Sequence, residues 1–554
     1  MQSALSKSAL PNFKQVLILV LFANASGLFI NILEPDGALY ASIAKHIIIQ
    51  NDWLNLFAYG SDWLDKPHLP FWLSALSFKI FGISALAYKL PSFVCFLLGV
   101  FYIYQFAKKL YSKELAQIAT LIYATSLHVI LSNFDVRAEG YLTAFVIAAI
   151  YHFYLAHENN WLKHIVLAAF FTACAIMTKG IFVLIIIASG FIVYWMINKQ
   201  WNQFLKAKWY LYLLLSFVFI FPELYALYQQ FDLHPEKIVF GKTNVSGLKF
   251  FFWDSQFGRF FNIGPIKGDG DIFFFVHTTL WAFLPWSVYL FIQVFKKIKN
   301  FSTPKNKASI IVYSTSFISF LLFSISQFQL PHYIVVIFPL LSIIVAKYLL
   351  QITSSKELKI AIYLQNFIFF ILVVLIAALV VFYKFNFLFL ILGILIIITQ
   401  YCFRFIKENS LNAVLLKGVC FTVLFTIFFN GFFYPSLMQY QAGMNAGKWQ
   451  KKNLEFSTIP MYRCNEFSFD FYGNSTLKIE NDLNNALNKN KSGLFFSSKQ
   501  EITKINRDSF NVKPIQWFPY YHITELKLDF INYKTRANTL DSFAIFSCQK
   551  KYSN

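Results

Sequence analysis

The sequence predicts an all-α polytopic membrane bundle of about thirteen transmembrane helices, followed by a small α/β domain at the C-terminal end. Of its 554 residues, 57% are hydrophobic and only 14% are charged, whereas about a quarter of the residues are charged in an average soluble domain. The apolar residues form continuous runs instead of alternating with polar ones, which favours helical spans over a strand barrel. This composition excludes a disordered chain, a nucleic-acid-binding tail and an ordinary soluble enzyme.

Thirteen apolar runs approach the length of about 20 residues that a helix needs to cross the hydrocarbon core of a bilayer. They cover residues 15–33, 87–107, 115–132, 139–156, 162–178, 180–197, 209–227, 275–295, 309–326, 332–350, 360–382, 385–403 and 413–433. The runs within 162–197 and within 360–403 are nearly fused, so the count carries a margin of one or two spans.

The charge distribution predicts the orientation of the chain. Its net charge is +21, and with the N-terminus inside, the inner segments hold 19 basic residues against four acidic ones. This is the bias that orients membrane proteins on insertion, so nucleic acid is not an expected partner. An odd number of spans places the C-terminus outside. We therefore expect a multi-pass protein of the cytoplasmic (inner) membrane, with a cytoplasmic N-terminus and an extracytoplasmic (periplasmic) C-terminal domain.

Two domains follow from this layout, a transmembrane domain over residues 1–433 and a soluble α/β domain over residues 434–554. In the second, short β-rich runs at 459–463, 494–497, 515–521 and 543–548 alternate with helix-like stretches such as 482–490. This domain contains Cys464 and Cys548, and an extracytoplasmic location permits their oxidation. A disulfide between them is possible, although two cysteines in a sequence carry no information on geometry.

Acidic residues concentrate on the predicted outer side, where thirteen of the 27 lie in loops or at the ends of spans. Ionisable groups at membrane depth are costly and usually functional, so this distribution indicates a reaction or binding site on the outer face. The first outer loop begins with Glu34 and Asp36, after which Leu39, Ile43 and Ile47 recur at helical spacing. We expect an amphipathic helix on the membrane surface, and a simple N-cap is the alternative interpretation of Asp36.

The same loop contains the segment Asp62-Trp63-Leu64-Asp65-Lys66-Pro67. A carboxylate and an ammonium group held by a proline at the membrane surface would suit the phosphate of a lipid. The alternative is a loop that interfacial tryptophans anchor, with Lys66 extending its ammonium group to the membrane surface.

Motifs within residues 15–345 carry a resemblance to a known family. They are Asp36-x-x-x-Tyr40-Ala41-x-Ile43-Ala44, Asn51-Asp52-Trp53-Leu54, Asp65-Lys66-Pro67-x-x-x-Phe71-Trp72-Leu73, Phe81-Gly82, Arg137-Ala138-Glu139, Thr178-Lys179-Gly180, Phe257-Gly258-Arg259-Phe260, Phe283-Leu284-Pro285-Trp286-Ser287 and Gln329-Leu330-Pro331-His332-Tyr333. In this order they resemble the ArnT-like and protein O-mannosyltransferase glycosyltransferases. The resemblance implies the membrane-embedded GT-C fold and a polyprenyl-phosphate sugar as donor.

The resemblance also implies roles for charged residues. Asp36 matches the catalytic carboxylate of the family, so we expect it to act as base, with Glu139 as a second carboxylate. Cations must hold the phosphate as charge builds on it. The candidates for this contact are Lys66, Arg259 and Arg137, and the candidates for contact with substrate or a metal ion are Asp65, Glu34 and His332.

Structural explanations remain open for several of these residues. Glu139 begins a predicted span, where the helix dipole favours an acid. Arg137 could pair with Asp135 or Glu139, and His332 could be a hydrogen-bonded cap. Lys179 lies at an outer turn, where an anchoring role is the simpler explanation.

The chain departs from the family pattern at several positions. Gly37 follows Asp36 where the family usually has Glu, and Gln329 stands where Lys is common. Residues 267–271 read Lys-Gly-Asp-Gly-Asp at a place where a His of the family can bind a metal. A divalent metal cofactor is therefore possible, but the His ligand of the family is missing.

The sequence thus predicts an integral membrane glycosyltransferase that moves a hexosyl or pentosyl group from a polyprenyl-phosphate donor. The acceptor would be a lipid A-like lipid, a glycan or a protein on the outer face of the cytoplasmic membrane. The alternative is a secondary transporter or flippase of a lipid-linked or polar substrate, against which the missing internal repeat argues. An inactive member with the same fold is a third interpretation.

Overall fold

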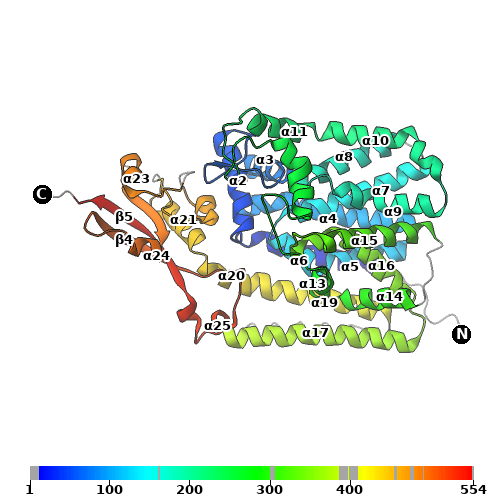
Figure 1. The fold of residues 1–554 in the computed structure, drawn as a ribbon. Helices are drawn as coiled ribbons and strands as arrows, with labels where there is room; N and C mark the ends of the chain where they lie inside the picture. Colours follow the sequence, from blue (N-terminus) through cyan, green and yellow to red (C-terminus); the bar gives the residue numbers. More distant parts are fainter. Residues whose placement is uncertain are drawn as a thin grey trace.

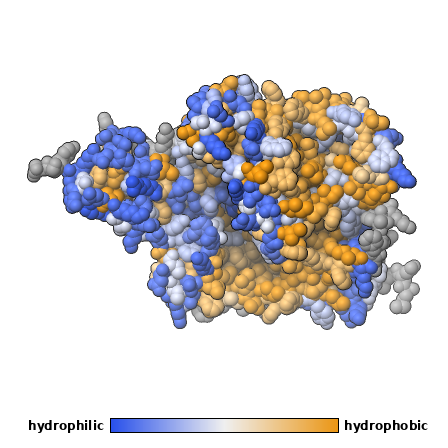
Figure 2. Space-filling view, in the orientation of Figure 1, coloured by the Kyte–Doolittle hydropathy of each residue, from blue (hydrophilic) through white to orange (hydrophobic). Residues whose placement is uncertain are grey.

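The computed structural model describes residues 12–159, 162–299, 306–385, 393, 397, 410–454, 458–474, 479–490 and 492–551. A bundle of helices forms its larger part, and a small domain with a sheet lies at one end of the bundle (Figure 1). Hydrophobic residues cover most of the visible face of the bundle, while hydrophilic residues cover the small domain and the loops near it (Figure 2). The chain is therefore a multi-pass membrane protein with an extramembrane domain.

Seven helical segments in the described part of the chain are long and apolar enough to cross a membrane. They are α4 (Ala85–Leu110), α7 (Ala138–Asn159), α8 (Leu162–Lys179), α15 (Lys307–Ile325), η5 with α16 (Pro331–Ile337 and Phe338–Leu350), α17 (Ser355–Tyr383), and the run of α19, η6, α20 and η7 (Leu411–Phe428, Phe429–Phe433, Tyr434–Leu437 and Met438–Tyr440). Two bent pairs raise the number to nine if each pair is one span. These pairs are α5 with α6 (Lys113–Ala124 and Leu127–Phe134), and α10 with α11 and η3 (Ala207–Phe219, Phe221–Leu227 and Tyr228–Asp232).

Shorter helices lie at the other expected spans that the structure describes. They are α1 with η1 (Phe13–Ala25 and Ser26–Phe29), α9 (Val183–Ile197), and α13 with α14 (Phe274–Ala282 and Ser287–Lys299). The first of these ends at Phe29, whereas the predicted span continues to residue 33. Residues 30–33 are not helical, so this end of the prediction is wrong. The expected span at 385–403 lies almost entirely outside the described residues, and the count of thirteen stays a prediction. Short elements in the connections are η2 (Trp201–Leu205), α12 (Gly247–Lys249) and the π-helical η4 (Phe250–Gly258).

The two bends have local causes. Between α5 and α6, which meet at 54°, the hydroxyls of Thr125 and Ser126 donate to the carbonyl oxygens of Leu121 and Ile122 at 2.5 and 2.7 Å. Such bonds from Ser and Thr to the preceding turn bend helices. In the second pair, bent by 41°, Pro222 lies in the first turn of α11, where its missing N–H interrupts the helix that precedes it.

The first loop, which the charge distribution predicts to lie outside, folds into α2 (Asp36–Gln50), the hairpin of β1 and β2 (Phe57–Ala58 and Ser61–Asp62) and α3 (Leu69–Phe81). The helix expected after Asp36 is present, and its residues Leu39, Ile43 and Ile47 pack against a cluster that includes Phe71. However, the polar side of α2 is buried against α22 (Phe467–Tyr472) of the small domain. The helix is thus packed between α3 on one side and α22 on the other, and its place at the membrane surface stays a prediction.

The small domain contains an antiparallel sheet in the order β3–β5–β4 (Leu494–Ser498, Asp541–Lys550 and Phe510–Tyr520). Its helices are α21 (Ala442–Asn453), α22, α23 (Leu483–Lys489), α24 (Lys499–Thr503), α25 (Leu528–Ile531) and the 3₁₀-helix η8 (Arg536–Thr539). The runs at 494–497 and 543–548 are confirmed as strand, as is 515–521 up to Tyr520, whereas 459–463 forms only isolated bridges. Because the last transmembrane run continues to Tyr440, it crosses the predicted border at 433/434, and the division into domains stays a prediction.

Cys464 and Cys548 are both free thiols in the structure, so the disulfide considered from the sequence is not formed. Cys548 belongs to the cluster with Phe546 and Ala544 on one face of β5. Cys464 packs with the cluster of Ile545, whose side chain points to the opposite face. The sheet itself therefore separates the two sulfur atoms.

Candidate active site

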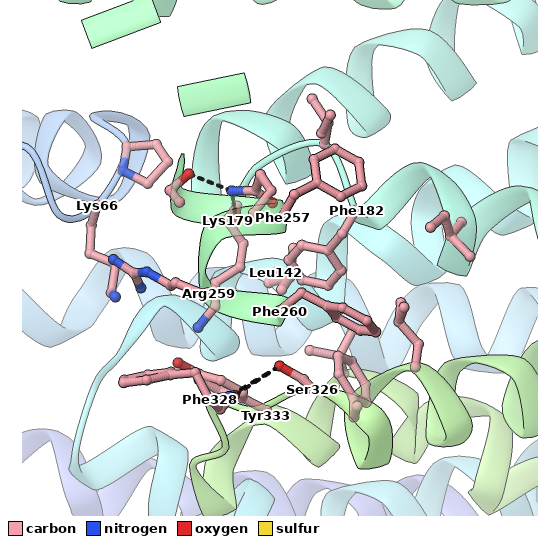
Figure 3. Close-up of a pocket in the computed structure, with 18 of the residues that line it drawn as sticks. Lys66, Leu142, Lys179, Phe182, Phe257, Arg259, Phe260, Ser326, Phe328 and Tyr333 are labelled. Atoms are coloured by element: carbon pink, nitrogen blue, oxygen red, sulfur yellow. Dashed lines mark hydrogen bonds between the residues drawn. The ribbon is translucent and has the colours of Figure 1, made fainter. Parts of the chain in front are cut away.

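A cavity of about 500 Å³ lies where the loop before α3 meets α7, α8, η4 and η5. Its polar wall contains Asp65, Lys66, Glu139, Lys179 and Arg259. Much of the remaining lining is apolar and comes from Leu142, Phe182, Ile185, Phe257, Phe260, Phe323 and Val336. Figure 3 shows Lys66, Lys179 and Arg259 on one side of the cavity, with Phe182 and Phe260 on the other. A ligand here would meet cations at one end and hydrocarbon at the other.

Asp65 holds two cations at the polar end. Its carboxylate pairs with the ammonium of Lys66 at 2.9 Å and with the guanidinium of Arg259. Burial raises the pKa of Asp65, but Lys66 and Arg259 outweigh burial and lower this pKa to about 2. Asp65 is therefore ionised at neutral pH, and its charge fixes both cations in place.

Arg259 lies directly after η4 and is the most constrained of the cations. Its Nη2 atom also donates to the carbonyl oxygen of Asp65 at 3.3 Å, and its guanidinium lies 5.5 Å from the ring centroid of Phe328. Its Nε atom is buried and has no hydrogen-bond partner among the described residues. A buried donor without a partner costs free energy, so the site has an unused capacity for an anionic ligand.

Glu139 lies in the first turn of α7 and is buried, with 2% of its side chain exposed. It pairs with Lys179 from the end of α8, whose ammonium lies 3.8 Å from the ring centroid of Tyr333. The Nε2 atom of His332 lies 3.6 Å from the other carboxylate oxygen of Glu139. Glu139 is thus the counter-ion of Lys179, which the sequence suggested only as an anchor.

Asp36 and Arg137 do not line the cavity but form a second charged group at the start of α2. Arg137 donates to Asp36 at 2.6 Å and to Asp135 at 2.9 Å, so one of the two suggested partners, Asp135, is found and the other, Glu139, is not. Pro35 occupies the N-cap and Asp36 is the first helical residue. The side chain of Asp36 is 40% exposed, against 19% for Asp65. Asp36 is therefore the more accessible of the two carboxylates.

Tyr40, one turn further along α2, connects these two charged groups. Burial raises the pKa of its phenol well above the ordinary value, and the negative charges of Asp65, Asp36 and Glu139 raise it further. The phenol therefore stays neutral. The charges of all three carboxylates reach Tyr40, so the Asp36 group lies near the polar end of the cavity.

A buried hydrogen-bonded pair of side chains braces the loop that carries Asp65 and Lys66. The Nδ1 atom of His68 lies 2.9 Å from Glu223 on α11, and the backbone N–H of His68 donates to the same carboxylate at 2.9 Å. The ring atom Nε2 contacts the carbonyl oxygen of Leu54 at 3.1 Å. This brace was not foreseen from the sequence, where Glu223 gave no sign of its partner.

The structure brings together most of the predicted site residues. Asp65, Lys66, Glu139 and Arg259 line the cavity, and His332 contacts one of them. Glu34 lies elsewhere, because its carboxylate accepts the backbone N–H groups of residues 467 and 468 in the small domain. The sequence interpretation missed Lys179 and Tyr333, although both belong to the quoted motifs.

The charged groups of the site do not form a metal centre of the usual kind. Among the residues that the structure describes, no three His, Cys, Asp or Glu side chains gather closely enough to hold an ion. Asp65 is already paired with two cations and Glu139 with one. This donor set does not fit the divalent metal considered from the sequence.

The chain is similar to known proteins in sequence and in fold. Residues 65–225 match the family model described as dolichyl-phosphate-mannose-protein mannosyltransferase. The crystal structure of ArnT from Cupriavidus metallidurans bound to undecaprenyl phosphate superposes with a TM-score of 0.72 at 15% identity, over 96% of this chain and 97% of that one. The chain has the ArnT fold, of GT-C type. This agrees with the resemblance to the ArnT-like family that the motifs indicate.

Relatives by sequence are consistent with this fold. An uncharacterised protein of Aquifex aeolicus (strain VF5) is 28% identical over 361 residues, which are 63% of this chain and 66% of the relative. The undecaprenyl phosphate-alpha-4-amino-4-deoxy-L-arabinose arabinosyl transferase 1 of Proteus mirabilis (strain HI4320) is 23% identical over 59% of this chain. The match covers 57% of that transferase. The chain thus spans less than two thirds of the length of either relative.

Proposed function

We propose that this ArnT-like chain is a membrane glycosyltransferase that moves a sugar from a polyprenyl-phosphate donor to an acceptor. The observation that carries this proposal is the cavity, which places Lys66, Arg259 and Lys179 at one end of an apolar lining. An anionic phosphate attached to a long hydrocarbon chain has the same two parts. The named relative and the structural neighbour, whose descriptions mention undecaprenyl phosphate, support this donor class.

Binding of the donor would use the polar end of the cavity for its phosphate. Arg259 offers a buried Nε–H without a partner, and its planar group suits two phosphate oxygens at once. Asp65 keeps Lys66 and Arg259 close together, so the phosphate enters a preorganised pair of cations. The polyprenyl chain would lie along the aromatic and aliphatic lining and extend into the bilayer.

Transfer requires an acceptor oxygen to attack C1 of the sugar while the bond between C1 and the phosphate oxygen breaks. The electron pair leaves with polyprenyl phosphate, whose additional charge Lys66 and Arg259 stabilise. Asp36 takes the proton of a hydroxyl acceptor, since it is the exposed carboxylate of the site. If the acceptor is the ionised phosphate of a lipid A-like lipid, Asp36 orients it and no proton moves.

The site would face the outer side of the cytoplasmic membrane, with the N-terminus inside. The excess of basic residues in the opposite loops supports this orientation. A lipid A-like lipid, a glycan or a protein on that side would be the acceptor. A single engineered cysteine in the exposed loop at Asp269, labelled in intact cells by a membrane-impermeant maleimide, would test the sidedness.

The activity test compares cells and purified protein that carry Asp36→Asn with the unchanged chain. Proteoliposomes with a radiolabelled undecaprenyl-phosphate sugar and candidate acceptors should show transfer, which Asp36→Asn lowers by a factor of about 100 or more. Glu236→Gln is the matched control, because it removes an exposed carboxylate that is not among the residues lining the cavity. Mass spectra of lipids, glycans and proteins that are identical with and without the unchanged chain would contradict the proposal.

A further inference from the structure

The helix that begins with Asp36 is held by the small C-terminal domain through buried polar contacts. The carboxylate of Asp470 on α22 accepts from Ser42 and lies 2.7 Å from the Nε2 atom of His46. The ammonium of Lys45 donates to the carbonyl oxygens of Asp470 and, at 2.9 Å, Gly473. Ser42, Lys45, His46 and Asp470 are each at most 5% exposed. These contacts fix the middle of α2 against the domain.

The chain just before α2 is fixed by the same domain. The carboxylate of Glu34 accepts the backbone N–H groups of Phe467 and Ser468 at 2.6 and 2.7 Å. The side chain of Gln441 accepts from the N–H of Glu34 at 3.1 Å and donates to the carbonyl oxygen of Ile32 at 2.9 Å. The segment Ile32–Glu34 is therefore hydrogen-bonded to the C-terminal domain through both backbone N–H and C=O groups, and Asp36 follows it by two residues.

Aromatic packing completes the contact between the loop and the domain. The ring of Tyr59 stacks on Phe467 with centroids 4.2 Å apart, and Phe78 of α3 contacts Phe471 at 6.0 Å. The hydroxyl of Tyr472 accepts from the N–H of Ile32 at 2.8 Å. All these partners come from α22 or the residues beside it, so one short segment of the domain touches the first outer loop at several points.

We propose that the C-terminal domain positions Asp36 for the reaction, with Glu34, Asp470 and Gln441 as positioning residues. The inference rests on the proposed function, in which Asp36 contacts the acceptor. Glu34 and Gln441 set where α2 begins, and Asp470 sets its rotation and tilt about 10 Å further along the helix, at a rise of about 1.5 Å per residue. A displacement of about 1 Å at a reacting group can cost a factor of about 100 in rate.

Because these contacts are polar, a change of one atom in a side chain can alter how the C-terminal domain holds α2. Removing one partner of a buried polar contact leaves the other partner unsatisfied, so the helix must shift or admit water. Glu34→Gln keeps the shape of the side chain, but its NH₂ group then faces one of the two backbone N–H donors. This variant should therefore displace the start of α2 while both domains stay folded.

The test measures helix position and catalysis separately in the full-length protein. Hydrogen exchange of residues 36–50 should become faster in Glu34→Gln, Gln441→Ala and Asp470→Asn. In the same variants kcat should fall about 10- to 100-fold, while the stoichiometry and affinity of polyprenyl phosphate binding stay unchanged. Full binding distinguishes misplaced Asp36 from misfolded protein. Glu525→Gln is the control, since it removes an exposed carboxylate of the same domain and should change neither measurement.

Two results would overturn the inference. Exchange of residues 36–50 that matches the unchanged protein in all three variants would mean that these contacts do not hold α2. Faster exchange with undiminished kcat would mean that the position of α2 does not limit the reaction. If the unchanged protein transfers no sugar, the proposed function fails, and the exchange measurement still decides whether the domain holds the helix.

Discussion

Replacing Arg259 by Met should weaken binding of the donor phosphate more than any other single change at the polar end of the cavity. A net hydrogen bond to a charged group contributes about 1.5–3 kcal/mol, and 1.4 kcal/mol corresponds to a factor of ten. Loss of one such bond therefore predicts a dissociation constant about 10- to 150-fold higher. The buried Nε–H, which lacks a partner among the described residues, places the expected effect in the upper half of this range.

Arg259→Lys separates charge from geometry. A lysine keeps the positive charge near Asp65 but cannot present two parallel N–H donors to a phosphate. We therefore expect binding between that of the unchanged protein and that of Arg259→Met. Lys242→Met, which removes an exposed cation of the outer loop, is the matched control and should leave binding unchanged.

The assay is equilibrium binding of radiolabelled polyprenyl phosphate to the full-length protein in nanodiscs, followed by kcat and KM with the sugar donor. Arg259 also stabilises the leaving phosphate in the proposed mechanism, so kcat should fall together with affinity. A dissociation constant for Arg259→Met within a factor of two of the unchanged value would refute the assignment of Arg259 to the phosphate. An affinity of Arg259→Lys equal to that of the unchanged protein would refute the argument from the planar group.

Three further predictions concern stability. Lys179→Met leaves the buried Glu139 without its counter-ion and should lower the free energy of unfolding by about 3–5 kcal/mol. The double variant Lys179→Met with Glu139→Gln should recover most of the lost stability, and thermal unfolding scans of both variants check this. Burial first, and then Asp470, raise the pKa of Glu34 to about 7, so the ionised carboxylate is the costlier form, and the free energy of unfolding should be highest below about pH 4.5 and fall as pH rises through 7. The protonated carboxyl, unlike the amide of Glu34→Gln, still offers both oxygens to the N–H groups of residues 467 and 468, and proteolysis of the domain contact across this pH range would report the change. Gly418→Ala would bring a methyl within 2.3 Å of Trp286 and should lower the unfolding temperature, whereas an unchanged temperature would contradict the close contact.

Much of the bundle could be predicted because hydrophobicity is a local property of the chain. A run of apolar residues must become a helix in lipid, since only that conformation satisfies its backbone groups. Two of the predicted spans nevertheless bend at Thr125–Ser126 and near Pro222. Both residue types are visible in the sequence, but whether a hydroxyl bonds back to the helix depends on the packing around it.

The sequence predicted which residues belong to the candidate site, but not which of them pair with one another. Asp65, Lys66 and Arg259 stood out as rare charges on an apolar chain, and they do line one cavity. The partner of Glu139 is Lys179, forty residues away on the next helix, and no local pattern indicates this pair. Glu34 was expected to contact substrate or metal, but it binds the backbone of α22.

The sequence by itself determined a polytopic helical protein with scarce acidic residues near one side, because transfer of side chains into lipid depends on each residue and its immediate neighbours. Tertiary structure alone decided which charges meet, which face of α2 is covered, and that Cys464 and Cys548 lie on opposite faces of a sheet. Ion pairs and buried contacts depend on distances between elements that are far apart in the chain. Those distances are fixed only when helices, loops and the C-terminal domain pack together.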